Sequence, residues 1–232
     1  MSQLIDNLNT IESIKTDIKA AIENKGVDMT GVSFPGYASK IGEISGGGTV
    51  GWDQKSFTEG TIEIINLDNS ASFVVSSAFD GNKTIQTVNL PYATIVRNYA
   101  FQSCTSLTQV NLPMCSYISG SAFKHCISLT QISLPMCSYI GPYAFSQCYV
   151  LAQISLLMCS KIDNNAFRNC ISLSIITIGY SSVCSLNNSS TFYKTPIASG
   201  TGSIYVPTSL VDAYKSATNW SYFSTQIFPI PE

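Results

Sequence analysis

The chain has 232 residues and a mass of 25.1 kDa, which suits one large domain or two small ones whose core needs no disulfide bonds. Charged residues make up 11% of the chain, below the typical value of about 25%, so neutral polar side chains must solvate the surface. The net charge is −2, and no apolar run approaches the roughly 18 residues of a membrane helix. The composition therefore argues against nucleic acid as a partner and against membrane insertion.

An amphipathic helix is predicted over residues 2–24, because apolar residues recur there at heptad-like spacing and leave the charged side chains outside. A helix of this length is only partly formed in water when it is alone, so it needs a partner surface. That surface is either the body of the same chain or a short coiled coil with other copies. The candidate oligomerisation residues are Leu4, Ile11, Ile14 and Ile18.

The first segment ends at a run of glycines. Residues 1–45 form a predicted helical docking or oligomerisation segment, and the glycine-rich residues 46–54 form a flexible linker. Residues 1–6 lack the basic start, the apolar run and the cleavage site of a secretory signal peptide. We therefore expect the chain to be made in a cytoplasm.

A 22-residue repeat dominates the rest of the chain. Ala-Phe dipeptides start at 22-residue intervals, at Ala78, Ala100, Ala122, Ala144 and Ala166. Between them runs a pattern such as Leu129-x-x-Ile132-x-Leu134-x-x-Cys137, whose spacing and period are typical of leucine-rich repeats. A single unit cannot bury its own apolar face. The sequence therefore predicts an α/β repeat fold, a right-handed leucine-rich-repeat solenoid of about five to six repeats over residues 55–186.

Each unit is expected to contribute a very short strand that pairs in parallel with its copies. In residues 110–112 the side chains alternate in, out and in, and a proline ends the strand at Pro113 and Pro135. Leu157 replaces this proline, which predicts one longer strand.

The outward side chains of these strands predict a continuous face that is polar and uncharged. Amide groups and tyrosine rings suit a glycan or a neutral protein surface, and the alternative is that they only solvate the solenoid. The candidate binding residues are Gln109, Asn111, Gln131, Ser133, Gln153 and Ser155, continued by Asn89 and Thr177 and joined by an aromatic pair, Tyr117 and Tyr139.

Seven of the eight cysteines fall at repeat positions, in two sets. One set is Cys104, Cys126, Cys148 and Cys170, and the other is Cys115, Cys137 and Cys159. No Cys-x-x-Cys pair or zinc spacing is present, so no metal site is predicted. We expect two columns of buried, reduced thiols, with Cys184 also in the core at the register position of Ile162.

Phenylalanine residues one repeat apart predict a further buried column on the other side of each coil. This column comprises Phe101, Phe123, Phe145 and Phe167.

Residues with catalytic potential are few. His125 is the only histidine, and it occupies a turn position that other repeats fill with Ser103 or Gln147, so we expect an exposed spectator. Asp163 is nearly alone as a carboxylate within the regular repeats, and no glycine-rich phosphate loop is present. The sequence predicts no catalytic residue, no cofactor and no enzyme. A glycan-active enzyme would need carboxylates on the strand face.

Residues 187–232 are predicted to form a C-terminal cap, since the exposed end of a solenoid needs a seal. Residues 202–207 have the pattern of a last strand, and residues 208–215 that of a helix capped by Thr208 or Ser209. The residues expected to seal the end are Trp220, Phe223, Ile227 and Phe228.

The units written Ala-Phe-x-x-Cys-x-Ser-Leu-x-x-Ile-x-Leu-Pro resemble the bacterial surface-antigen class of leucine-rich repeats, often called BspA-like. The segment from Ile204 to Trp220 looks like the usual closing segment of that family, so the resemblance covers residues 55–232. It implies an adhesin or an interaction module.

The opening of the chain, from Ile5 through Val27, resembles leaders on structural proteins of tailed gut bacteriophages. A phage protein reaches the outside by lysis of the host and needs no signal peptide. The two resemblances together suggest a non-enzymatic virion appendage, a head or tail fibre exposed at the virion surface. Residues 1–45 would attach it to other virion proteins or assemble a homo-oligomer, with a trimer favoured, and the strand face would bind a host surface protein or glycan. The alternative is a bacterial BspA-like interaction module outside any virion, in the cytoplasm or at the cell surface.

Overall fold

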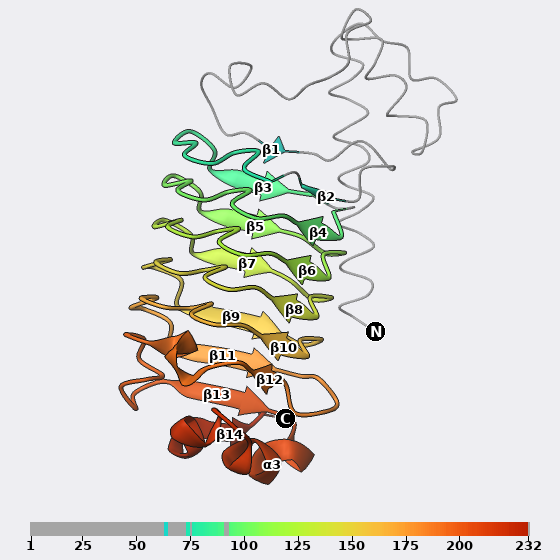
Figure 1. Cartoon of the computed structure of the whole chain (residues 1–232), viewed down its shortest axis with the longest axis vertical. Coiled ribbons are helices and arrows are strands. Elements are labelled where there is room, and N and C mark those ends of the chain that lie inside the picture. Colours follow the sequence, from blue (N-terminus) through green and yellow to red (C-terminus); the bar gives the residue numbers. More distant parts are fainter. Residues whose placement is uncertain (1–62, 65–72, 75, 91–92, 232) are drawn as a thin grey trace, which may run out of the picture.

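The computed structural model describes residues 63–64, 73–74, 76–90 and 93–231. These residues form a stack of coils, each laid on the preceding one, that ends in a small helical cap (Figure 1). The predicted segment 1–45, the linker 46–54 and the four candidate oligomerisation residues lie outside the described part of the chain.

Two rows of short parallel strands run along the stack, because each regular coil contributes one strand to each row. The first row contains β1 (Glu63–Ile64), β3 (Thr87–Asn89), β5 (Gln109–Asn111), β7 (Gln131–Ser133), β9 (Gln153–Leu156), β11 (Ile175–Ile178), β13 (Ser203–Val206) and β14 (Ile227–Pro229). The second row contains β2 (Phe73–Val74), β4 (Ile95–Val96), β6 (Tyr117–Ile118), β8 (Tyr139–Ile140), β10 (Lys161–Ile162) and β12 (Ser185–Leu186).

The pairing register follows the sequence repeat. Val110 pairs with Val88 on one side and with Ile132 on the other, and each partner lies one repeat away in the sequence. The predicted solenoid of stacked repeats is thereby confirmed. Strand β9 has four residues where β5 and β7 have three, as expected from Leu157 at the usual proline position.

The first row is interrupted between β7 and β9. Its strands form two separate sheets, β1-β3-β5-β7 and β9-β11-β13-β14, while the second row is continuous from β2 to β12. No backbone hydrogen bond joins β7 to β9 among the described residues. The stack is held together at this point by β8 and β10 and by the core behind them.

A column of phenylalanine rings passes through the core, as predicted, and it is longer than expected. Neighbouring rings lie nearly parallel, with centroids 5.1 to 5.8 Å apart. Offset stacking of this kind adds about 0.5–1.5 kcal/mol per pair to the burial of the rings. The members are Phe79, Phe101, Phe123, Phe145, Phe167 and Phe192.

All eight cysteines are free and buried, as predicted. The expected register of Cys184 is wrong, because Ile162 pairs with Leu186 and not with Cys184. The connection from β10 to β12 is longer than the regular repeat that separates β8 from β10. This longer connection places the Cys184 side chain against that of Cys159, so Cys184 extends the second thiol column.

His125 does not match the expected exposed spectator. Its backbone has a φ of 62°, and its half-buried ring lies with Nδ1 3.2 Å from Oε1 of Gln147. Its ring also meets that of Tyr149 edge-on, with the centroids 6.1 Å apart. The repeated left-handed turn aligns side chains one repeat apart, which places Gln147 beside His125.

The cap contains four short helices and the strand predicted over residues 202–207, which is β13; it is not the last strand, because β14 follows it. The helices are η3 (Ser189–Phe192), η4 (Thr208–Leu210), α3 (Val211–Ser216) and η5 (Ser221–Gln226). Thr208 and Ser209 lie within η4 and do not cap a helix, because α3 begins after Leu210 without a side-chain cap hydrogen bond.

The end of the core is closed as predicted by Trp220, Phe223 and Ile227, which are buried. The indole Nε1 of Trp220 donates a hydrogen bond of 2.6 Å to the carbonyl oxygen of Cys184. Phe228 does not belong to this seal, because it remains 42% exposed. It follows the buried Ile227 in β14 and, like Pro229 after it, is exposed.

Candidate functional site

A groove of about 600 Å³ runs across the first row of strands. Residues of β3, β5, β7, β9 and β11 line it, so five successive coils contribute to one surface. The structure brings together six of the eight candidate binding residues there, namely Gln109, Asn111, Gln131, Ser133, Gln153 and Ser155, together with Asn89 and Thr177.

Alternate residues of each strand point outward, so the outward side chains that line the groove form two rows. The glutamine row is Thr87, Gln109, Gln131, Gln153 and Ile175. The asparagine-serine row is Asn89, Asn111, Ser133, Ser155 and Thr177. Members of a row occupy equivalent positions on different coils, about 4.8 Å apart where the strands pair directly.

Amide groups in neighbouring coils hydrogen-bond to one another. Nδ2 of Asn111 donates to Oδ1 of Asn89 over 3.0 Å, and Nε2 of Gln109 donates to Oε1 of Gln131 over 2.6 Å. These bonds orient the amides, while each amide retains hydrogen-bonding capacity for a ligand. Ser133 and Ser155 are exposed, and their hydroxyls make no hydrogen bond to another described residue.

The interruption between β7 and β9 gives the groove an apolar floor near its centre. Ile132 takes the inward register position, as Val110 does, yet it is only half-buried while Val110 and Ile154 are each 3% exposed. Ile132 lines the groove beside these residues. The groove therefore offers hydrogen-bonding groups along its length and a small apolar surface in the middle.

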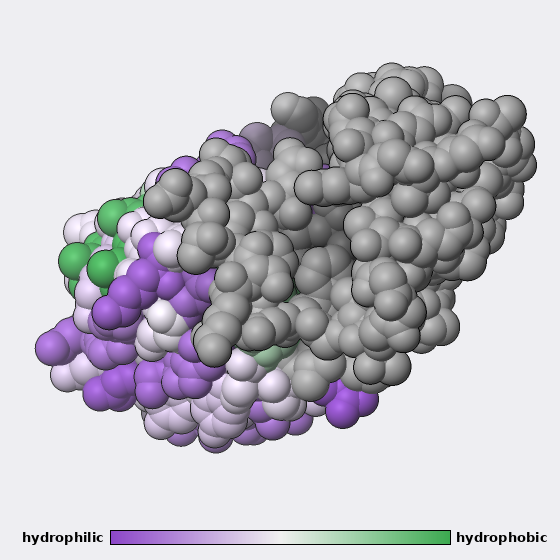
Figure 2. Space-filling view, turned by 90° about the horizontal axis from the view of Figure 1, so that it is seen from above, coloured by the Kyte–Doolittle hydropathy of each residue, from purple (hydrophilic) through white to green (hydrophobic). Residues whose placement is uncertain are grey.

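The described lining of the groove is electrically neutral. Among the residues that the structure describes there, none is an aspartate, glutamate, lysine or arginine. The described surface seen from above is mainly hydrophilic or of intermediate hydropathy, with a few hydrophobic residues at one side (Figure 2). A charged ligand would lose hydration in this groove without gaining an opposite charge, so the lining favours an uncharged partner.

The asparagine-serine row continues into the cap, which the sequence repeat does not predict. Thr177 pairs with Tyr205, and Tyr205 pairs with Phe228. Their two rings make a tilted contact, with centroids 6.3 Å apart and planes at 45°. The step from Thr177 to Tyr205 is longer than the regular repeat, so the repeat does not reveal this pairing, although the alternation in residues 203–206 does mark a strand.

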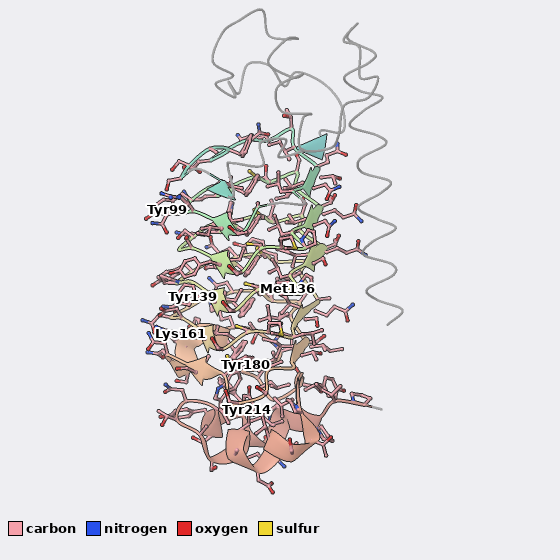
Figure 3. The ribbon with its side chains drawn as sticks, turned by 90° about the vertical axis from the view of Figure 1, so that its right-hand side faces the viewer. Tyr99, Met136, Tyr139, Lys161, Tyr180 and Tyr214 are labelled. Atoms are coloured by element: carbon pink, nitrogen blue, oxygen red, sulfur yellow. The ribbon has the colours of Figure 1, made fainter. Side chains whose placement is uncertain are left out.

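Tyr117 and Tyr139 lie on the second row of strands, so the expectation that they join the polar face is corrected. Their rings stack with centroids 4.3 Å apart and planes at 20°. The hydroxyl of Tyr139 donates to Oδ2 of Asp163 over 2.9 Å, and Nζ of Lys161 lies 5.7 Å from the centre of the Tyr139 ring. Figure 3 shows Tyr139 and Lys161 together on one row of strands, away from the other row.

Burial and the contacts of Asp163 shift the pKa values of Tyr139 and Asp163. Burial, followed by the hydrogen bond to Asp163, raises the pKa of the Tyr139 hydroxyl. Burial alone would also raise the pKa of the Asp163 carboxyl, but hydrogen bonds from the Asn164 backbone, Asn187 and Tyr139 lower it overall. Asp163 is therefore a structural acceptor that holds Tyr139 and Asn187 in place.

Neither metal binding nor thiol chemistry is favoured by the described part of the chain. It contains no cluster of three or more His, Cys, Asp or Glu side chains suited to a metal ion. Burial raises the pKa of the Cys104 thiol to about 12, and that of Cys115 to about 11, which opposes a nucleophilic thiolate. No helix within the described ranges has the length and apolar character needed to cross a bilayer.

Comparisons with known proteins agree with this architecture. The family model of the BspA type leucine rich repeat region matches residues 52–173 and 94–221, in 6 copies. A leucine-rich repeat protein from Bacteroides ovatus ATCC 8483 matches with a TM-score of 0.57 and 22% identity over 73% of this chain and 42% of that chain. This chain thus spans less than half the length of that protein.

A second solved structure, the leucine rich repeat protein of T. pallidum, matches with a TM-score of 0.41 and 22% identity, over 58% of this chain and 72% of that chain. No curated protein matches the sequence.

Proposed function

The chain belongs to the BspA-type leucine-rich repeat family, and on that premise we propose that it is a non-enzymatic binding module whose groove holds a neutral macromolecule of a host cell surface, a glycan or a protein. One observation carries the proposal. The groove is lined by the outward polar residues of five successive strands of the first row, and no charged side chain is among the lining residues that the structure describes. Such a lining provides oriented hydrogen bonds without a charge to favour an ionic partner.

The proposed setting is the surface of a bacteriophage virion, where the chain would be a head or tail fibre that attaches to the host. Residues 1–45 would join it to other virion proteins or assemble a trimer. The resemblance of the opening residues to phage leaders supports this setting, because it accounts for an exposed adhesin made in a cytoplasm. The alternative is a bacterial interaction module of the same family outside any virion. Mass spectrometry of purified virions from the phage that encodes the chain would distinguish the two.

A matched pair of serines tests the groove. Ser155 is exposed on β9 inside the groove, and Ser185 is exposed on β12 in the second row. We expect Ser155→Lys to reduce binding of the labelled full-length protein to intact gut-bacterial cells at least tenfold, because it places a charge on a neutral surface. Ser185→Lys, which adds the same charge outside the groove, should leave binding unchanged. Flow cytometry over a panel of strains measures both.

The proposal fails if no strain binds the unaltered protein, or if both lysine variants bind as it does. Equal weakening by both variants would indicate a general effect of charge on adsorption, and it would also exclude the groove as the binding site.

A further inference from the structure

We infer that the groove, together with the aromatic residues of the cap, is a track for a neutral polysaccharide, with one sugar ring seated against Tyr205 and Phe228. This inference rests on the proposed function, because it names the class of ligand and adds a site for one of its units. Neither residue belongs to the groove lining, and both continue its asparagine-serine row.

The asparagine-serine row extends from the coils into the cap. Asn89, Asn111 and Ser133 lead through Ser155 and Thr177, and the pairing of β11 with β13 and of β13 with β14 then carries the same row onto two aromatic rings. Within each of the two sheets the side chains of this row leave the same side, since residues in register on parallel strands share a face, and the groove lining spans both sheets. A single extended ligand can therefore contact the hydroxyls and amides of the coils and the rings of the cap.

Phe228 is exposed in the cap, next to residues that are buried. Three neighbouring apolar side chains of the cap, Trp220, Phe223 and Ile227, are buried, whereas Phe228 is 42% exposed beside the half-buried Tyr205. The seal is complete without Phe228, so its ring contributes little to closing the core. An exposed ring presents an apolar face to which the C–H groups of a sugar can pack, and the adjacent tyrosine adds a polar tip that can hydrogen-bond to a hydroxyl.

The chemistry of the remaining row favours a sugar polymer over a protein. The free hydroxyls of Ser133 and Ser155 and the oriented amides of Asn111 and Gln131 both donate and accept hydrogen bonds, which matches a ligand rich in hydroxyl groups. The core of a protein interface is enriched in aromatic residues, Met and Arg and is surrounded by a polar rim. The described lining of the groove contains none of these residue types, and its half-buried apolar residues are Ile132 and Ile175.

The test uses full-length protein and intact cells of a strain that binds it. Cells are treated either with periodate, which cleaves sugar diols, or with proteinase K, and the neutral polysaccharide fraction of the same cells serves as a soluble competitor. We expect periodate and the soluble fraction each to abolish binding, and proteinase K to leave it intact. Loss of binding after proteinase K, with periodate-treated cells still bound, would overturn the polysaccharide assignment while leaving the proposed function standing.

Variants at the cap test whether a sugar ring packs against Tyr205 and Phe228. Phe228→Leu keeps an apolar side chain but removes the ring, and we expect about tenfold weaker binding, the loss of about 1.4 kcal/mol of contact. Phe228→Tyr keeps the ring and should bind like the unaltered protein. The control is Tyr222→Leu, which removes a ring that is 74% exposed in the same cap but outside the row.

Full binding by Phe228→Leu, with Ser155→Lys impaired, would overturn the seat while the groove remained the binding site. Equal weakening by Phe228→Leu and Tyr222→Leu would also overturn it, because the effect would then follow exposed aromatic surface in general. Full binding by Ser155→Lys would instead remove the proposed function itself, so the two failures are distinguishable.

Discussion

Buried thiols satisfy backbone carbonyl groups in both cysteine columns. Sγ of Cys126 donates to the carbonyl oxygen of Phe101 over 3.1 Å, and Sγ of Cys148 donates to that of Phe123 over 3.2 Å. In the other column, Sγ of Cys137 donates to the carbonyl oxygen of Tyr139 over 3.3 Å. The carbonyl oxygens of Phe101 and Phe123 also accept from the backbone N–H groups of Cys104 and Cys126, so the repeated cysteine supplies packing and a second, weak donor at once.

The thiols predict an alkaline limit to stability. Burial raises the pKa of Cys104 to about 12 and that of Cys115 to about 11, from an ordinary value of 9.0. Because the folded pKa lies above the unfolded one, this contribution to stability is complete below pH 9 and is lost as the pH rises through the folded pKa. Above pH 9 each such thiol lowers the free energy of unfolding by about 1.4 kcal/mol per pH unit.

Urea unfolding at a series of pH values from neutral to about 10 measures this slope. The variant Cys115→Ala should have a shallower slope by one thiol's contribution, after allowance for its lower stability at neutral pH. A free energy of unfolding that stays constant across this range would contradict the prediction.

At the scale of the element, each coil must lie close to its neighbour for the ladders of both rows to form. Gly141 follows β8 and packs directly on the preceding coil. A Cβ atom at Gly141 would lie 2.8 Å from the carbonyl carbon of Ser119, 2.9 Å from the backbone nitrogen of Gly120 and 2.9 Å from the carbonyl oxygen of Ile118. All three are backbone atoms, so a side chain at this position forces the coils apart.

We therefore expect Gly141→Ala to destabilise the solenoid by about 1–3 kcal/mol through overpacking. The control is Gly120→Ala in the preceding coil, whose Cβ would meet only ordinary contacts at 3.4 to 3.5 Å. Its effect should stay within about 1 kcal/mol, since an alanine also reduces the entropy of the unfolded chain. Thermal and urea unfolding measure both, and equal destabilisation would show that the spacing of the coils does not depend on Gly141.

At the scale of the whole molecule, the described coils and the cap form one stack with a continuous core. The phenylalanine column extends from Phe79 to Phe192, and the ring of Phe192 contacts those of Trp220 and Phe223 in the cap. The predicted helical segment 1–45 is not needed for this seal, because the cap lies at the other end of the sequence.

We expect deletion of residues 1–45 to leave a folded monomer, while the full chain forms a homo-oligomer. The reason is that the segment carries a narrow apolar stripe that needs a partner surface. Multi-angle light scattering gives the mass of each, and circular dichroism checks that the truncated chain keeps its strands. An unchanged oligomer after truncation would show that the solenoid itself carries the contact.

The register, the phenylalanine and cysteine columns and the polar strand face were predictable from the sequence, because identical residues repeated at a constant interval must stack in order to be buried. Val110 with Asn111 and Ile132 with Ser133 show the same alternation, which predicts their faces without any tertiary information. The candidate site is therefore predictable from the sequence wherever the coils have the regular length.

Only the tertiary structure placed the residues at which the repeat changes length. Cys184 lies beside Cys159, and Tyr205 and Phe228 continue the asparagine-serine row. In each case the connection is longer than the regular repeat, so counting by the repeat length gives the wrong partner, whereas backbone pairing aligns the strands. The interruption between β7 and β9 likewise leaves no trace in the repeat. Spacing in a sequence predicts which residues are equivalent when each coil has the same length, whereas the hydrogen bonds and packing between coils decide how an inserted residue is accommodated.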